Sequence, residues 1–169
     1  MAALFVALAA GAAVACGGDG GGMDAQAYLE ALDGRLSQAD DESEALFSDP
    51  EFVRVASGSG PLSDEDREIA RNALESVSAT FDSFLADVED FDPPEELQEE
   101  HDELVAAYRE LDQQFSDIVL SQVDDAETID DINQAFDELT TAAGERTSAA
   151  CLAMQAEAEV NDVDVDLNC

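Results

Sequence analysis

Residues 97–122 read LQEEHDELVAAYRELDQQFSDIVLSQ, and this stretch decides the fold. One series of residues recurs along it in alternating steps of four and three: Leu97, His101, Leu104, Tyr108, Leu111, Phe115, Ile118 and Gln122. Residues at these steps share one face of an α-helix, and a regular alternation is the seam by which helices pack in coiled-coil-like bundles. The segment therefore predicts a long helix that buries this face against other helices.

Three further segments show the same helical spacing of apolar residues. The first is predicted over 24–48, with Asp24 as its N-cap. The second begins at Ser63 and stops before Pro93, and the last runs from Thr128 to about Val160. The predicted apolar face of the first segment consists of Tyr28, Leu29, Leu32, Leu36, Ala39, Leu46 and Phe47. That of the second consists of Ile69, Ala70, Ala73, Leu74, Val77, Phe81, Phe84, Leu85 and Val88. That of the last consists of Ile129, Ile132, Phe136, Leu139, Ala143, Ala150, Met154 and Ala158.

Proline, glycine and acidic residues predict where these helices stop or weaken. Pro50 ends the first helix, because the residue before a proline is pushed out of the α region. Residues 51–55 are then predicted as a short extended piece, and 58–61 as a loop. Within the helices, the acidic run 39–44 and the glycine and arginine of 144–146 are predicted weak spots.

The four segments predict an all-α fold. Their connections are short enough to make neighbours antiparallel, so the expected architecture is an antiparallel four-helix bundle. A stack of helical hairpins is the alternative, but the sequence shows no repeat period.

The charge of the chain excludes several classes of partner. The 169 residues include 42 Asp or Glu against six Arg and no Lys, a formal net charge of −36. Nucleic acids and anionic lipid headgroups are bound mainly through Lys and Arg, so neither is an expected partner. Apolar residues make up 46%, which is enough for one domain with a buried core.

The first residues predict export. Residues 2–15 form an uncharged apolar run of fourteen, too short to span a bilayer but suited to the hydrophobic region of a signal peptide. It ends in Ala13-Val14-Ala15, the small residues that a signal peptidase accepts, and Cys16 follows at once. Cleavage after Ala15 in an ordinary secreted protein is one interpretation of this pattern.

Ala13-Val14-Ala15-Cys16 resembles the lipobox of bacterial lipoproteins. The resemblance implies that a diacylglycerol is attached to the Cys16 sulfur, that Cys16 becomes the mature N-terminus, and that the protein is lipid-anchored on the extracytoplasmic face of the cell membrane. The sequence departs from the pattern at Ala13, where Leu is usual, and in having no basic residue before the apolar run; a start upstream of Met1 would supply one. The chain then divides into a signal peptide (1–15), a lipidated cysteine and Gly-rich tether (16–23), a helical body (24–160) and a tail (161–169).

The cysteine count agrees with a lipid on Cys16. An exported protein rarely leaves an exposed thiol free, and lipidation of Cys16 leaves Cys151 and Cys169 as one pair.

Residues 161–169 alternate apolar and acidic side chains, which predicts an extended tail. Such a tail reaches from the helix end back to Cys151, so we predict a Cys151–Cys169 disulfide with the tail antiparallel to the last helix, worth about 3 kcal/mol by the chain-entropy estimate.

Two groups of residues are candidate metal ligands, and both fall short of a known site. His101 is the only histidine, but neither Gln98 nor Leu104 supplies the glutamate of the Glu-x-x-His motif of di-iron bundles. Its seam position favours a buried histidine bonded to a neighbouring helix. Asp162, Asp164 and Asp166 have the spacing that opens a calcium loop, but the glycine and the final glutamate are missing, so a solvated edge is favoured.

Enzymatic motifs are missing from the sequence. It contains no nucleophile elbow, no Gly-rich phosphate loop and no lysine, and paired acids occur everywhere. We therefore expect neither catalysis nor a cofactor.

A second resemblance covers parts of the body. Three parts of the body resemble uncharacterised extracytoplasmic helical lipoproteins of high-GC bacteria: Pro93-Pro94-Glu95-Glu96-Leu97 followed by His101, Leu104 and Ala107, then Ala150-Cys151, and the closing Asp166-Leu167-Asn168-Cys169. The resemblance implies a helical body without an assigned activity. Two functional hypotheses follow: a non-enzymatic binding or structural module of the cell envelope with an unknown protein or ligand partner, and an acidic module that binds cations or metals.

Overall fold

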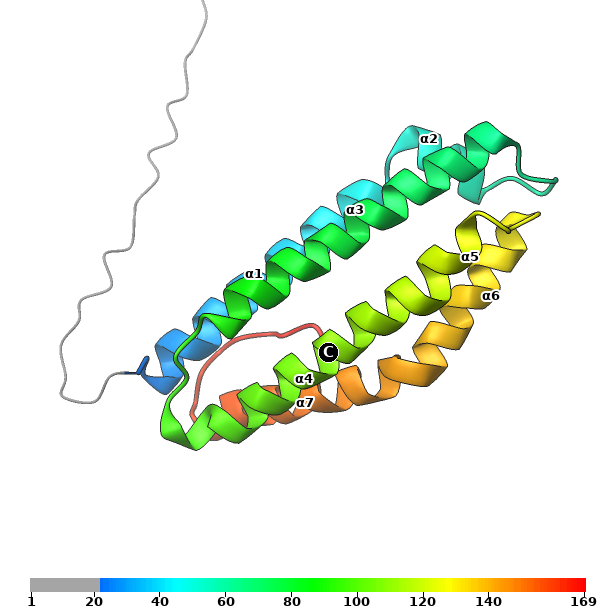
Figure 1. Cartoon of the computed structure of the whole chain (residues 1–169). Helices are drawn as coiled ribbons and strands as arrows, with labels where there is room; N and C mark the ends of the chain where they lie inside the picture. The colour runs from blue at the N-terminus through cyan, green and yellow to red at the C-terminus, as the bar shows by residue number, and fades with distance from the viewer. Residues whose placement is uncertain (1–21) are drawn as a thin grey trace, which may run out of the picture.

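The computed structural model describes residues 22–169, and within them the regular elements are all helical (Figure 1). The predicted signal peptide, Cys16 and most of the predicted tether lie outside the described residues. The elements in chain order are α1 (Ala25–Phe47), α2 (Pro50–Ala56), α3 (Asp64–Glu89), the 3-10 turn η1 (Glu95–Leu97), α4 (Gln98–Gln114), the π-helical η2 (Phe115–Leu120), α5 (Ser121–Val123), α6 (Ile129–Leu139), the π-helical η3 (Thr140–Gly144) and α7 (Glu145–Val160).

The helices α1, α3 and α6 begin directly after Asp24, Ser63 and Thr128, the residues at which the sequence predicts helix starts. The Asp24 side chain accepts a hydrogen bond from the Ala27 amide at 2.9 Å. Ser63 and Asp66 form a reciprocal capping box, with two backbone–side-chain bonds of 3.1 Å. At the start of α6 the Asp131 carboxylate accepts from the Thr128 amide at 2.7 Å. Each cap satisfies backbone N–H groups that have no partner within the helix, which fixes where these helices start.

The predicted extended piece at 51–55 is wrong, because Pro50–Ala56 is the helix α2. The Asp49 side chain accepts hydrogen bonds from the amides of Glu51 at 2.8 Å and Phe52 at 3.1 Å. Pro50 occupies the first helical position, where its missing N–H has no cost. The Asp-Pro pair therefore ends α1 and also starts the next helix, and only the first effect was predicted.

The seam of 97–122 faces the core as predicted through Phe115, with Tyr108 and Leu111 half-buried, and then shifts by one residue. Beyond Phe115 the buried residues are Val119 and Val123, whereas the predicted Gln122 is exposed. The shift coincides with η2, where the π-helical turn holds one more residue than an α-turn. The extra residue turns every later residue of the helix by one position relative to the core. The predicted placement of Gln122 in the seam is therefore wrong.

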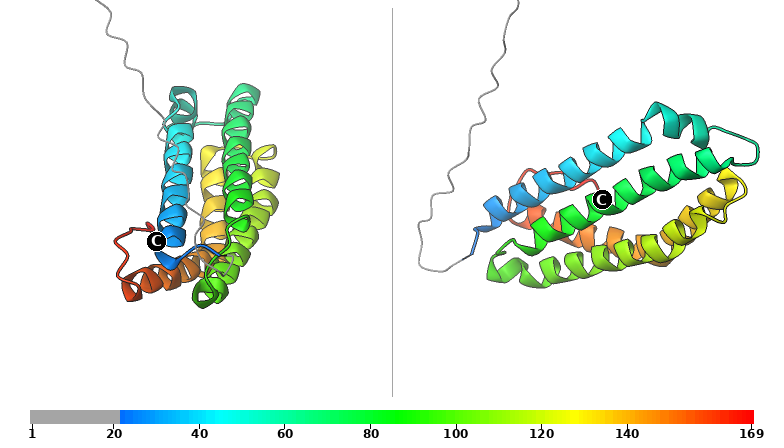
Figure 2. Two further views of the ribbon diagram at one scale, coloured as in Figure 1. Left: turned by 90° about the vertical axis from the view of Figure 1, so that its left-hand side faces the viewer. Right: turned by 45° about the horizontal axis from the view of Figure 1, so that its top comes forward.

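The helices pack side by side as an elongated helical bundle (Figures 1 and 2). α1 lies along α3, and α4 lies along both α3 and α7, while α6 lies against η2. The buried side chains form two separate clusters. Cluster 1 joins α1, the second half of α3, α4 and α7, and cluster 2 joins α2, the first half of α3, η2, α5 and α6.

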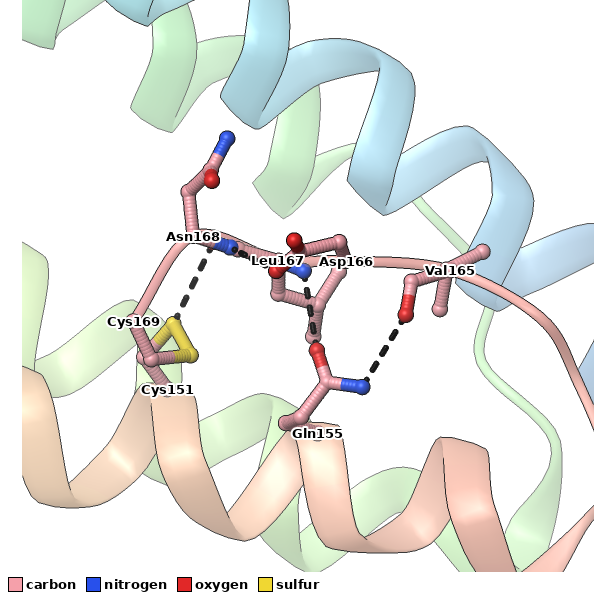
Figure 3. Close-up of a disulfide and its surroundings, with 7 residues drawn as sticks. All are labelled: Cys151, Gln155, Val165, Asp166, Leu167, Asn168 and Cys169. Carbon is pink, nitrogen blue, oxygen red and sulfur yellow. Dashed lines mark hydrogen bonds between the residues drawn. A yellow bond between two sulfur atoms is a disulfide. The ribbon is translucent and has the colours of Figure 1, made fainter.

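The predicted disulfide Cys151–Cys169 is present, and the tail runs back along α7 (Figure 3). The Gln155 side chain holds the tail backbone twice, donating to the Val165 carbonyl at 3.0 Å and accepting from the Leu167 amide at 2.8 Å. Leu167 is 2% exposed within cluster 1. Figure 3 shows the tail between α7 and the helix α1, so it fills the seam between them.

Candidate functional site

A cavity of about 350 Å³ lies where the two core clusters meet. Its wall combines Leu36 and Phe84 of cluster 1 with Val77, Phe115 and Leu139 of cluster 2. The volume falls within the range of roughly 300–1,000 Å³ that is usual for small-molecule sites. Because its lining is mainly apolar and comes from several helices, the cavity is the best candidate binding site in the described part of the chain.

Aromatic rings dominate the lining of this cavity. The six aromatic lining residues are Phe47, Phe81, Phe84, Tyr108, Phe115 and Phe136. The Phe84 and Tyr108 rings lie 4.8 Å apart, and Phe115 contacts both Phe81 at 5.9 Å and Phe136 at 6.0 Å between ring centroids. Phe81, Tyr108 and Phe136 are only half-buried, although all three occupy core positions of their helices. The cavity thus leaves aromatic surface that no side chain of the described body covers.

Two π-helical segments flank the cavity. Phe115, the first residue of η2, lines it, and so does Leu139, which directly precedes η3. Such segments interrupt the regular spacing of an α-helix and occur frequently at functional sites. Here they lie on the two neighbouring helical stretches at the level of the cavity, where the two clusters fail to merge.

The mouth of the cavity carries one carboxylate. Among the lining residues Asp40 is the only charged one, and it is exposed on α1. Burial together with the negative charge of Asp40 raises the pKa of Tyr108 to about 12. The Tyr108 phenol is therefore neutral at physiological pH and lies within electrostatic reach of the Asp40 carboxylate.

The arginines are engaged elsewhere on the surface. Each of the six forms an ion pair within the described chain: Arg35 with Asp87, Arg54 with Asp66, Arg67 with Asp64, Arg71 with Glu75 and Asp124, Arg109 with Glu89, and Arg146 with Glu103 and Glu110. Arg146 bridges two helices, and its hydrogen bonds with both carboxylates raise its pKa. The predicted weak spot at 144–146 is thus a change of helix type, with the chain held to α4 by this arginine.

His101 lies in the core, as the heptad pattern predicts. It is 5% exposed, and its Nδ1 lies 3.0 Å from the Tyr28 hydroxyl on α1. Burial lowers the pKa of His101, while the nearby Asp102 opposes this shift. Burial also raises the pKa of Tyr28 well above its usual value. This neutral pair is a buried hydrogen bond between two helices, as the sequence favoured over a metal ligand.

The other candidate ligands face solvent. Asp162, Asp164 and Asp166 are exposed along the tail, while the residues between them turn toward cluster 1. Across residues 22–169 no group of three or more His, Cys, Asp or Glu side chains is arranged to hold a metal ion. None of the helices in this part of the chain is both long and apolar enough to cross a bilayer.

The cavity was not predicted from the sequence, although its apolar and aromatic lining residues were predicted to lie on core faces. Phe81, Tyr108 and Phe136 were assigned to buried faces. One signal was available on the first helix, where the apolar series Leu32, Leu36 continues into the polar residues Asp40 and Ser43 before Phe47. Polar residues on a core face indicate that the face is not fully covered at that level.

Comparison of the chain with protein-family models, with curated proteins and with solved structures returns no match.

Proposed function

We propose that this protein is a non-enzymatic binding module of the cell envelope, lipid-anchored through Cys16 on the extracytoplasmic face of the membrane. The body is proposed to be an antiparallel four-helix bundle that holds a small apolar molecule in the cavity between its two core clusters. The observation that carries the proposal is the cavity itself, with six aromatic residues among its lining. Packing of α1 along α3, and of α4 along α3 and α7, supports the bundle arrangement.

The support for the anchor is the sequence of the first residues. The apolar run 2–15, the small residues before Cys16 and the pairing of Cys151 with Cys169 are all consistent with a lipid on the remaining cysteine. Mass spectrometry of the mature N-terminus in a bacterial host tests this. A diacylglyceryl Cys16 in the membrane fraction, and release of a Cys16→Ser variant from it, are expected. An unmodified Cys16 or another mature start contradicts the anchor.

Binding in the cavity can be tested with the neutral dye Nile red, whose emission shifts to the blue in an apolar site. The full-length chain with Cys16→Ser, so that no lipid is attached, is expected to bind it. Ala39→Phe places a ring in the cavity lining and should abolish the shift. The matched control Ala79→Phe adds the same ring on the exposed side of α3 and should leave binding unchanged. Equal binding by both variants excludes the cavity as the site.

A further inference from the structure

The charges around the cavity distinguish between classes of ligand. Asp40 is the only charged lining residue, and every arginine of the chain is paired with carboxylates away from the lining. The chain as a whole has a formal net charge of −36. An anionic ligand would therefore meet repulsion and no cation to offset it, whereas a cation is attracted both by the field and at the mouth.

The aromatic lining favours the same class. A cation near the face of an aromatic ring is attracted by the ring quadrupole, with the largest effect where water is excluded. Phe47 and Tyr108 line the cavity together with Asp40, and Phe47 is 38% exposed at the end of α1. Phe84 and Phe115 are 1% exposed and form the closed floor, so the half-buried rings of Phe81 and Phe136 supply the apolar surface that a ligand can contact. The site thus combines an apolar interior with a carboxylate and aromatic rings.

We propose that the cavity binds an organic cation with an apolar, preferably aromatic, body, the body lying against the half-buried rings of Phe81 and Phe136 and the protonated amine lying against the Asp40 carboxylate. This inference rests on the proposed binding function and adds the ligand class. The proximity of Asp40 to the Tyr108 phenol, which the raised pKa of Tyr108 reflects, brings a hydrogen-bonding group to the same place. A neutral phenol can accept a hydrogen bond from an ammonium group.

The test uses three probes with one body and different charge: 4-phenylbutylamine, 4-phenylbutanol and 4-phenylbutyrate. Each is titrated by calorimetry into the full-length Cys16→Ser chain with the disulfide intact. We expect the order amine, alcohol, carboxylate, with steps of about tenfold in Kd, as charge-assisted contacts are stronger than neutral ones. Displacement of Nile red by the amine shows that the probe enters the same site.

Two neighbouring carboxylates supply the control for local charge. Asp40→Asn should weaken the amine about tenfold and leave the alcohol unchanged. Asp41→Asn removes the same unit of charge from an exposed residue that does not line the cavity, and it should leave the amine nearly unchanged. If both variants lose the same amount of affinity for the amine, only the overall negative charge of the protein attracts it. That result would overturn the assignment to Asp40.

The failures of this inference and of the proposed function are distinguishable. If Nile red binds and is lost in Ala39→Phe, but the alcohol binds as tightly as the amine, the binding function stands and the cationic ligand class is wrong. If neither the dye nor any of the three probes binds, both are wrong.

Discussion

The seam between α1 and α7 has two parts that differ: a filled length, which the C-terminal tail occupies, and an open length, which forms the cavity. Near Cys151 the tail fills it, with Leu167 buried against cluster 1 and Gln155 holding the tail backbone on both sides. One helical turn earlier on α7, at Thr147, the same seam opens into the cavity. In the filled length the tail is inserted between regular α-helices, whereas at the level of the cavity two neighbouring stretches become π-helical and no segment is inserted.

The two lengths differ in the contacts that join their parts. In the filled length, a disulfide and two side-chain–backbone hydrogen bonds attach the tail to α7, and the Tyr28–His101 contact joins α1 to α4. The open length is lined in part by small or polar side chains, such as Ala39 and Ser43, which do not fill the space between the helices. The cavity therefore borders the end of the body that the tail closes.

The largest expected effect comes from releasing the tail. Replacing both Cys151 and Cys169 by alanine removes a link across a sequence separation of 18 and should lower the free energy of unfolding by about 3 kcal/mol. Urea denaturation measures the loss, and hydrogen exchange should show the Leu167 amide losing protection. Asp164→Ala, on an exposed residue of the tail, is the control with little change. Unchanged stability and protection would mean that packing alone holds the tail.

The same substitution in the two lengths should have different costs. Ala158 is fully buried in cluster 1, so Ala158→Leu should lower stability by about 1–3 kcal/mol through overpacking. Ala39 lines the cavity, so Ala39→Leu should cost less than about 0.5 kcal/mol or stabilise the protein, because the added carbons bury apolar surface in empty space. Thermal denaturation of both variants compares them directly. Similar losses in both would contradict an open cavity.

The Tyr28–His101 pair should make the filled length sensitive to pH. Because burial lowers the pKa of His101, the unfolded chain binds a proton at a higher pH than the folded one. Stability should therefore fall as the pH falls from about 7.5 toward 5.5, through the ordinary histidine pKa of about 6.5. His101→Gln should remove this part of the slope, measured by urea midpoints at each pH. Parallel slopes for the two proteins would show that His101 does not contribute.

Tyr28→Phe tests the hydrogen bond of the same pair without removing the ring. It leaves a buried histidine nitrogen without its partner 3.0 Å away and should cost about 1–2 kcal/mol at pH 7.5. Tyr108→Phe, in the cavity lining, is the comparison, because the Tyr108 ring is only half-buried and should lose less. Urea denaturation measures both. A larger loss for Tyr108→Phe would reverse the contrast between the two lengths.

Added salt should stabilise the filled and open lengths equally, and its effect on the melting temperature is the smallest of those predicted. The acidic residues cover the whole body, so repulsion between them is screened as the Debye length falls to about 3 Å near 1 M salt. The melting temperature should rise by a few degrees between 0.1 and about 2 M sodium chloride. A flat or falling melting curve would show that this repulsion is unimportant.

Prediction from the sequence succeeded where one local signal dominates. The caps at Asp24, Ser63 and Thr128 are confirmed, because side-chain to backbone bonds depend on residues three apart. The burial of His101 and the Cys151–Cys169 pair are confirmed as well. Prediction failed at Pro50–Ala56, where one Asp-Pro signal has two meanings. It also failed at Gln122, where a π-turn that no spacing reveals changed the register.

The sequence by itself determined that the body is helical, which residues lie on its apolar faces, and how the last nine residues return to Cys151. These follow from periodicity, capping and cysteine parity, all of which depend on neighbours along the chain. Only the tertiary structure decided that the apolar faces form two clusters rather than one, and that a cavity with a single carboxylate lies between them. Whether a seam closes depends on the volumes of side chains brought together from several helices, and that sum is formed only when the helices pack.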